Sequence, residues 1–257
     1  AWSSDGKRIY FISNHEVAHG TGDIVCMPAD RSDTSIIIRR EETAWNTRPD
    51  ISPDGSRMVY SSYSGGNFHQ LWMLPSSGGY PMPLTYGEFD NTCPRWSPDG
   101  QRLASGSSDS TIHLWESASG KHLHTLQMPI GAVFVVAWSP DGQILATASY
   151  DGDIHLYDSN TMRSNRALEG HSHYISSLTW SPTGKIFASG SYDKTIRIWD
   201  VENLCSMRIL EGHTHAVTEV SFSADGQILA SKSPDGTVRL WRSSDWQPLA
   251  TIDGERA

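Results

Sequence analysis

Residues 137–149 read Ala-Trp-Ser-Pro-Asp-Gly-Gln-Ile-Leu-Ala-Thr-Ala-Ser, two short apolar stretches on either side of a Pro-Asp-Gly tripeptide. Proline presets a negative φ and glycine accepts a positive one, so this tripeptide is typical of a tight turn. Two apolar segments joined by such a turn predict a β-hairpin. The stretch therefore predicts two antiparallel strands connected around Asp141.

The same pattern returns along the chain at a nearly constant interval. The tripeptides are centred on Asp5, Asp54, Asp99, Asp141, Thr183 and Asp225, and successive centres lie 49, 45, 42, 42 and 42 residues apart. In the fifth unit, the alternating stretch 195–199 and the stretch 207–210 supply two further strands. Four short strands in about 42 residues are typical of a β-propeller blade.

Six such units predict an all-β fold, a β-propeller of six four-stranded antiparallel blades forming a single domain over residues 1–257. The first blade is expected to have a shortened inner strand, because only Ala1-Trp2-Ser3 precedes its turn tripeptide. Soluble proteins avoid unpaired sheet edges. A closed monomer is therefore the expected state, and a paired dimer is the alternative if the inner strand does not form.

Composition excludes several classes of protein. The chain carries 20 basic and 29 acidic residues, a net charge of −9, and has no basic stripe, which argues against a nucleic-acid partner. No run of 18 apolar residues is present, so no helical membrane span is expected. The three cysteines are widely spaced and match no metal-ligand pattern. No signal-peptide pattern stands at residue 1, and the expected location is the cytoplasm.

Residues 97–257 resemble the WD-repeat propellers, a likeness carried by Gly170-His171 with Ile198-Trp199-Asp200 and by Gly212-His213 with Leu240-Trp241-Arg242. The resemblance implies a buried tetrad of His, Ser or Thr, Asp and Trp, in which every polar group finds a partner. The two complete sets that match are His171, Ser191, Asp193 and Trp199, then His213, Ser233, Asp235 and Trp241.

Two earlier units keep only part of this pattern. The first retains Ser107, Asp109 and Trp115, and the second retains Ser149, Asp151 and Tyr157. Gly87 and Pro129 stand where the histidines would be. These two blades are expected to be less rigid than the two that follow them.

Residues 1–96 resemble the TolB-like propeller repeats instead. The resemblance is carried first by residues 2–11 and 51–60, which both begin with an apolar residue followed by Ser-x-Asp-Gly, then Lys or Ser, then Arg. It is also carried by residues 70–85, which run from Gln-Leu-Trp-Met-Leu through Gly-Gly to Pro-Leu-Thr. A change of repeat type near Trp96 indicates either a divergent natural array or a recombined, artificial chimera.

The segment His15-Glu16-Val17-Ala18-His19 matches the zinc-protease motif, whose chemistry needs both histidines on one face of a helix. Here the motif lies in a loop of about nine residues between two predicted strands, with Gly20 and Gly22 nearby. Such a loop gives no catalytic helix, so we interpret the match as coincidence. The histidine pairs at 122 and 124, 171 and 173, and 213 and 215 meet no metal-ligand spacing either.

No nucleophile elbow, phosphate-binding loop or paired-cysteine motif is present, and we expect no enzymatic activity, no cofactor and no metal site. In WD-repeat propellers the turn with the tetrad Asp and the loop with the tetrad His meet on one face. On that face the sequence places candidate binding residues for a protein or peptide partner: Tyr150, His173, Tyr174, Tyr192 and His215.

The leading hypothesis is thus a non-enzymatic protein-interaction scaffold. Two alternatives stay open. The first is an accessory propeller of a larger hydrolase or transport system, which the TolB-like resemblance implies. The second is an engineered hybrid that has no evolved partner, which the change of repeat type near Trp96 favours.

Overall fold

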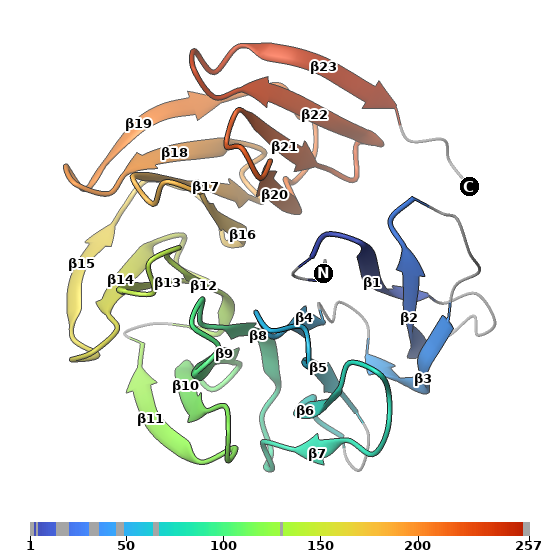
Figure 1. The fold of residues 1–257 in the computed structure, drawn as a ribbon. Coiled ribbons are helices and arrows are strands. Elements are labelled where there is room, and N and C mark those ends of the chain that lie inside the picture. Colours follow the sequence, from blue (N-terminus) through green and yellow to red (C-terminus); the bar gives the residue numbers. More distant parts are fainter. Residues whose placement is uncertain are drawn as a thin grey trace. The chain divides into compact units, whose positions relative to one another are not determined.

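The computed structural model describes residues 3, 5–13, 21–30, 36–44, 49–63, 67–128 and 131–253. These residues form strands, turns and loops, with no helix among them. The strands make six antiparallel sheets, which we number as blades 1 to 6 in chain order (Figure 1). The predicted fold class, an all-β propeller with six blades, is confirmed by these sheets.

The chain groups into two compact units, Ala1–Gln127 and Met128–Ala257, with three blades in each. The prediction of a single domain stays a prediction. The unit boundary follows blade 3, whereas the change of repeat type was predicted near Trp96, inside that blade.

In the first unit, blade 1 has the strand order β1-β2-β3, blade 2 has β4-β5-β6-β7, and blade 3 has β11-β10-β9-β8. The strand bounds are β1 (Arg8–Ser13), β2 (Thr21–Pro28), β3 (Ile36–Ala44), β4 (Asp50–Ile51), β5 (Arg57–Ser62), β6 (Gln70–Pro75), β7 (Met82–Pro83), β8 (Asn91–Trp96), β9 (Arg102–Ser107), β10 (Thr111–Glu116) and β11 (His122–Gln127).

In the second unit the order within each blade is consecutive. The strands of blade 4 are β12 (Val133–Trp138), β13 (Ile144–Ser149), β14 (Ile154–Asp158) and β15 (Ser164–Leu168). Those of blades 5 and 6 are β16 (Ile175–Trp180), β17 (Ile186–Ser191), β18 (Ile196–Asp200), β19 (Cys205–Leu210), β20 (Glu219–Phe222), β21 (Ile228–Lys232), β22 (Thr237–Arg242) and β23 (Pro248–Asp253).

Blade 1 is the exception to the four-stranded pattern, because three strands are seen in its described part. The shortened inner strand was expected at Ala1-Trp2-Ser3, and residues 1, 2 and 4 lie outside the described residues. The His15–His19 motif also lies outside them, between the observed strands β1 and β2.

The turn between the first two strands of blade 4 shows why the Ser-Pro-Asp-Gly sequence recurs. The Ser139 hydroxyl donates to Asp141 Oδ1 at 2.6 Å, and the Gln143 backbone N–H donates to the same oxygen at 3.0 Å. Gly142 takes a φ of +70°, a backbone conformation that is unfavourable for residues with a Cβ atom. Blade 5 has Thr183 in place of the aspartate, and its hydroxyl lies 3.1 Å from that of Ser181.

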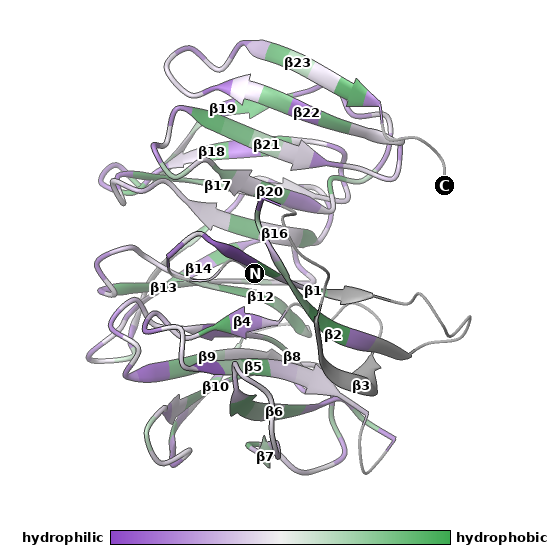
Figure 2. Cartoon of the chain, turned by 45° about the vertical axis from the view of Figure 1, so that its right-hand side comes forward, coloured by the Kyte–Doolittle hydropathy of each residue, from purple (hydrophilic) through white to green (hydrophobic). Residues whose placement is uncertain are grey.

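Burial follows the position of a strand within its blade. All residues of β17 except the first are buried, whereas five of the six residues of β19, the fourth strand of blade 5, are exposed. Figure 2 shows hydrophobic stretches on strands such as β13 and hydrophilic residues in many connecting loops. The faces of neighbouring blades pack on each other, as where Trp180 Nε1 of blade 5 donates to the Ala137 carbonyl of blade 4 at 3.2 Å.

Among the described residues, none lies in a helix long and apolar enough to cross a membrane. In the same part of the chain, no group of three or more His, Cys, Asp or Glu side chains converges in a way that would hold a metal ion.

Candidate functional site

A hydrogen-bonded tetrad anchors the loops of blade 5. His171 Nδ1 lies 2.7 Å from Asp193 Oδ2, and His171 Nε2 lies 2.7 Å from the Ser189 hydroxyl. Trp199 Nε1 donates to the same hydroxyl at 2.8 Å. Because the Ser189 oxygen accepts from Trp199, its own hydrogen is free for His171 Nε2, and the neutral ring then carries its proton on Nδ1, facing Asp193.

Blade 6 repeats this arrangement. His213 Nδ1 lies 2.9 Å from Asp235 Oδ2, and His213 Nε2 lies 2.9 Å from the Ser231 hydroxyl. Trp241 Nε1 donates to Ser231 at 3.0 Å. Two blades therefore build the same buried network from residues at the same spacing.

The tetrad hydroxyl was predicted at Ser191 and Ser233, and this assignment is wrong, because Ser189 and Ser231 hold those positions. Ser191 instead donates to the backbone carbonyls of His173 and Tyr174, both at 3.0 Å, and accepts from the Asp193 backbone N–H. Residues two apart on a strand point to the same face, so the sequence pattern does not distinguish the two serines.

The tetrad aspartates are held in their charged form. Burial would raise the pKa of Asp193, but hydrogen bonds from His171 and Thr195 outweigh it and keep that pKa well below its ordinary value. The pKa of Asp235 is lowered in the same way, with Thr237 and His213 as the main donors against the effect of burial. Each carboxylate therefore favours the folded state while it is ionised.

In the corresponding network of blade 4, the hydrogen-bond acceptor is a thioether sulfur. The Tyr157 hydroxyl donates to Met128 Sδ at 3.1 Å, and the Thr147 hydroxyl donates to the same sulfur at 3.7 Å. Pro129, which was assigned to the histidine position, lies outside the described residues. Met128 was not predicted, and its buried side chain lies between two hydroxyls.

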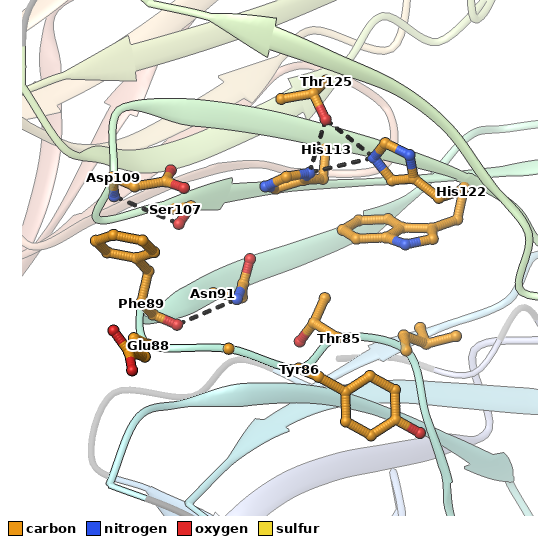
Figure 3. A pocket seen from close by; sticks show the side chains of 13 residues that line it. Thr85, Tyr86, Glu88, Phe89, Asn91, Ser107, Asp109, His113, His122 and Thr125 are labelled. Atoms are coloured by element: carbon orange, nitrogen blue, oxygen red, sulfur yellow. Dashed lines mark hydrogen bonds between the residues drawn. The ribbon is translucent and has the colours of Figure 1, made fainter.

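Blade 3 has a cavity of about 340 Å³ at this position. Its lining includes Gly87, Asp109 and Trp115 (Figure 3). His122, which is exposed on β11, also lines the cavity, and its Nε2 lies 3.2 Å from His113 Nδ1. The prediction that Gly87 replaces a tetrad histidine agrees with the place of this residue in the cavity wall.

Aromatic rings gather on the loops of the second unit. Tyr174 and Tyr192 have ring centroids 3.9 Å apart, Tyr150 stacks on Tyr174 at 5.7 Å, and His173 stacks on Tyr192 at 5.9 Å. Tyr150 is 60% exposed and Tyr192 is 40% exposed. Four of the five predicted binding residues thus form one cluster, open to solvent.

Phe134 belongs to the same cluster and was not predicted. Its ring lies 5.5 Å from that of Tyr174 and 6.3 Å from that of Tyr150. The register of β12 shifts between Val133 and Val135, and such a bulge re-aims the side chain between them. We define the aromatic cluster as Phe134, Tyr150, His173, Tyr174 and Tyr192.

His215, the fifth predicted binding residue, belongs to the corresponding loop of blade 6. It is exposed, and Nδ1 of its ring lies 3.2 Å from the Thr214 hydroxyl. The ring contacts that join the cluster members to one another do not include His215 among the described residues.

These blades and tetrads define a class of propeller, the one built from WD repeats. The family described as "WD domain, G-beta repeat" matches residues 91–116, 120–158, 162–200 and 204–242, together more than half of the chain. The chain therefore belongs to the WD-repeat family.

Curated relatives share shorter segments. The uncharacterized peptidase YuxL of Bacillus subtilis (strain 168) is 37% identical over 67 residues, which cover 23% of this chain and 10% of YuxL. The serine-threonine kinase receptor-associated proteins of Homo sapiens and Bos taurus are each 37% identical over 59 residues, 23% of this chain and 17% of theirs. The chain thus spans less than a fifth of the length of these relatives.

Proposed function

We propose that this chain is a non-enzymatic protein-interaction module and that the aromatic cluster is its contact surface. Membership of the WD-repeat family supports the module, since such propellers commonly bind protein partners. The observation that carries the site is the convergence of five rings from four separate chain segments, with Tyr150 and Tyr192 exposed to solvent. Tyrosine supplies a large contact area with a polar tip at low entropic cost.

The tetrad of blade 5 fixes the two loops that carry His173, Tyr174 and Tyr192. Asp193 follows Tyr192 directly, and its Oδ2 accepts from the His171 ring and from the Ser172 backbone N–H at 3.1 Å. Ser191 ties the same turn to the carbonyl of Tyr174. The surface is therefore preorganised, which lowers the entropy lost on binding.

The chemistry of the cluster favours a basic partner. Tyrosine ring faces attract guanidinium and ammonium groups. The net charge of −9 raises the rate of encounter with a cationic segment. A peptide segment that presents arginine or lysine among apolar residues fits both features.

The test starts from peptides selected on the intact protein from a random library. The affinity of a selected peptide is then measured for the parent protein and for a triple variant that combines Tyr150→Ala, Tyr174→Ala and Tyr192→Ala. We expect at least a tenfold loss, because hot-spot aromatics carry most of the binding energy. Tyr63→Ala with Tyr80→Ala is the matched control, since both residues are exposed tyrosines of the first unit. Equal affinity for the triple variant and the parent excludes this surface.

The match to the peptidase YuxL favours a second candidate function. In it, the TolB-like repeats of residues 1–96 make the chain an accessory propeller of a larger hydrolase. Hydrolase screening of the chain with and without a chelator tests whether the chain itself has activity. Turnover that is lost both with the chelator and in His15→Ala contradicts the non-enzymatic proposal.

A further inference from the structure

Blade 3 keeps the three other members of the tetrad that in blade 5 includes the His171 ring. Ser105, Asp109 and Trp115 each lie 84 residues before Ser189, Asp193 and Trp199, two repeat lengths away. The residue 84 positions before His171 is Gly87. The chain thus retains the hydrogen-bonding partners of an imidazole ring at a position where it supplies no ring of its own.

Asp109 and Trp115 line the cavity of blade 3 together with Gly87, and Ser105 is not one of its lining residues. A Cβ placed on Gly87 would meet no atom within 4 Å. The Ser105 hydroxyl is fully buried and finds no hydrogen-bond partner among the described residues. Leaving a buried hydroxyl without a hydrogen bond is unfavourable, and the counterparts of Ser105 in blades 5 and 6 each contact a histidine nitrogen.

The wall on the Gly87 side is held in place by blade 2. The Gln70 amide, which is buried, donates to the carbonyl of Gly87 at 3.3 Å and to that of Phe89 at 3.2 Å. The Thr85 hydroxyl accepts from the Leu71 backbone N–H at 2.8 Å. The loop that forms this wall is therefore fixed by hydrogen bonds on both sides of Gly87.

The opposite wall is made of aromatic rings. His113 and His122 share the Thr125 hydroxyl at 3.3 and 3.1 Å (Figure 3). The ring centroid of Trp115 lies 5.6 Å from that of His113. Burial and the neighbouring His122 lower the pKa of His113. An aromatic wall of this kind suits a flat heteroaromatic ring.

We propose that blade 3 binds an imidazole ring from outside the chain, which takes the place that His171 and His213 have in blades 5 and 6. The ring N–H donates to Asp109, and the second ring nitrogen accepts from the Ser105 hydroxyl. The cavity is larger than a five-membered ring, so the ring can carry a substituent. Tyr86 and Phe89, which are 79% and 51% exposed, mark the side that is open to solvent.

The experiment titrates imidazole into the intact protein, with a chelator present to exclude bridging metal ions, and follows the NMR signals of the tryptophan indole groups. We expect saturable binding with a dissociation constant on the order of 1 mM, a realistic affinity for a five-atom ligand. Nuclear Overhauser contacts from imidazole to Trp115 locate the ring. Absence of saturation, or contacts only to other tryptophans, overturns the proposal.

Two substitutions test the ring partners. Asp109→Asn and Ser105→Ala should each weaken imidazole binding at least fivefold. The matched control is Asp99→Asn, which alters an exposed carboxylate in the Pro-Asp-Gly turn of the same blade and should leave the affinity unchanged. Unchanged affinity in both Asp109→Asn and Ser105→Ala, with Trp115 contacts retained, contradicts the assigned hydrogen bonds.

Two sources can supply the ring, a free small molecule or a histidine side chain of a partner protein. N-acetylhistidine amide and a short peptide with one central histidine are compared with imidazole, and the same peptide with phenylalanine is the control. Tighter binding of the peptide than of imidazole indicates a partner side chain, and binding of the small ligands alone indicates a free compound. Equal binding of the phenylalanine peptide overturns recognition of the imidazole nitrogens.

Discussion

At the scale of single residues, the tetrad hydroxyl is the group whose removal has the clearest expected cost. Ser189→Ala leaves His171 Nε2 and Trp199 Nε1 buried without a partner. We expect the free energy of unfolding to fall by about 1–3 kcal/mol. Ser206→Ala is the control, because this serine is exposed and its change should stay within about 0.5 kcal/mol. Urea denaturation measures both, and equal midpoints would refute the role of Ser189.

The same tetrads predict how stability depends on pH. The folded-state pKa values of Asp193 and Asp235 are lowered, so their contribution is complete above the ordinary carboxyl pKa near 4 and is lost as the pH falls further. The free energy of unfolding should therefore decrease steeply below about pH 4. Asp193→Asn should flatten this decrease while lowering stability at neutral pH. A variant with the parent's pH dependence would contradict the assignment.

At the scale of an element, the turn of blade 5 lacks a bond that the other blades have. Thr183→Asp supplies an acceptor for the Ser181 hydroxyl and for the backbone N–H of Lys185, as Asp141 does for Ser139 and Gln143. We expect a gain of roughly 0.5–1.5 kcal/mol in the free energy of unfolding.

The reverse substitution in blade 4, Asp141→Thr, is the matched control for this turn. It should lower the free energy of unfolding by a similar amount, because it removes the acceptor of two hydrogen bonds. Thermal or denaturant melts compare both variants with the parent. If the two substitutions shift stability in the same direction, the carboxylate is not what stabilises the turn.

At the scale of the whole molecule, stability should differ between the two units. Strands β9 and β17 both end in Ala-Ser-Gly-Ser and have the same burial pattern. Ser189 of β17 belongs to a complete tetrad, whereas the Ser105 hydroxyl of β9 has no hydrogen-bond partner among the described residues. Local opening costs less where polar groups are unsatisfied. Native-state hydrogen exchange should therefore be at least about tenfold slower in β17. Equal protection of the two strands would contradict this.

The candidate site could be predicted in part from single residues. Turn and loop positions indicated Tyr150, His173, Tyr174 and Tyr192, and the structure brings these four together. Phe134 could not be predicted, because its side chain is re-aimed by a bulge that depends on the pairing of two strands.

The sequence by itself determined the blade count and the turns, because Pro-Asp-Gly repeats and alternating apolar residues act over a few neighbours. It also determined the histidines, aspartates and tryptophans of the complete tetrads. Only the tertiary structure decided between Ser189 and Ser191, which share one face of one strand. The contact of Met128 with Tyr157 and the cavity beside Asp109 are also seen only in the tertiary structure. Those contacts join segments far apart in the chain, and their geometry is fixed by packing, which no local pattern records.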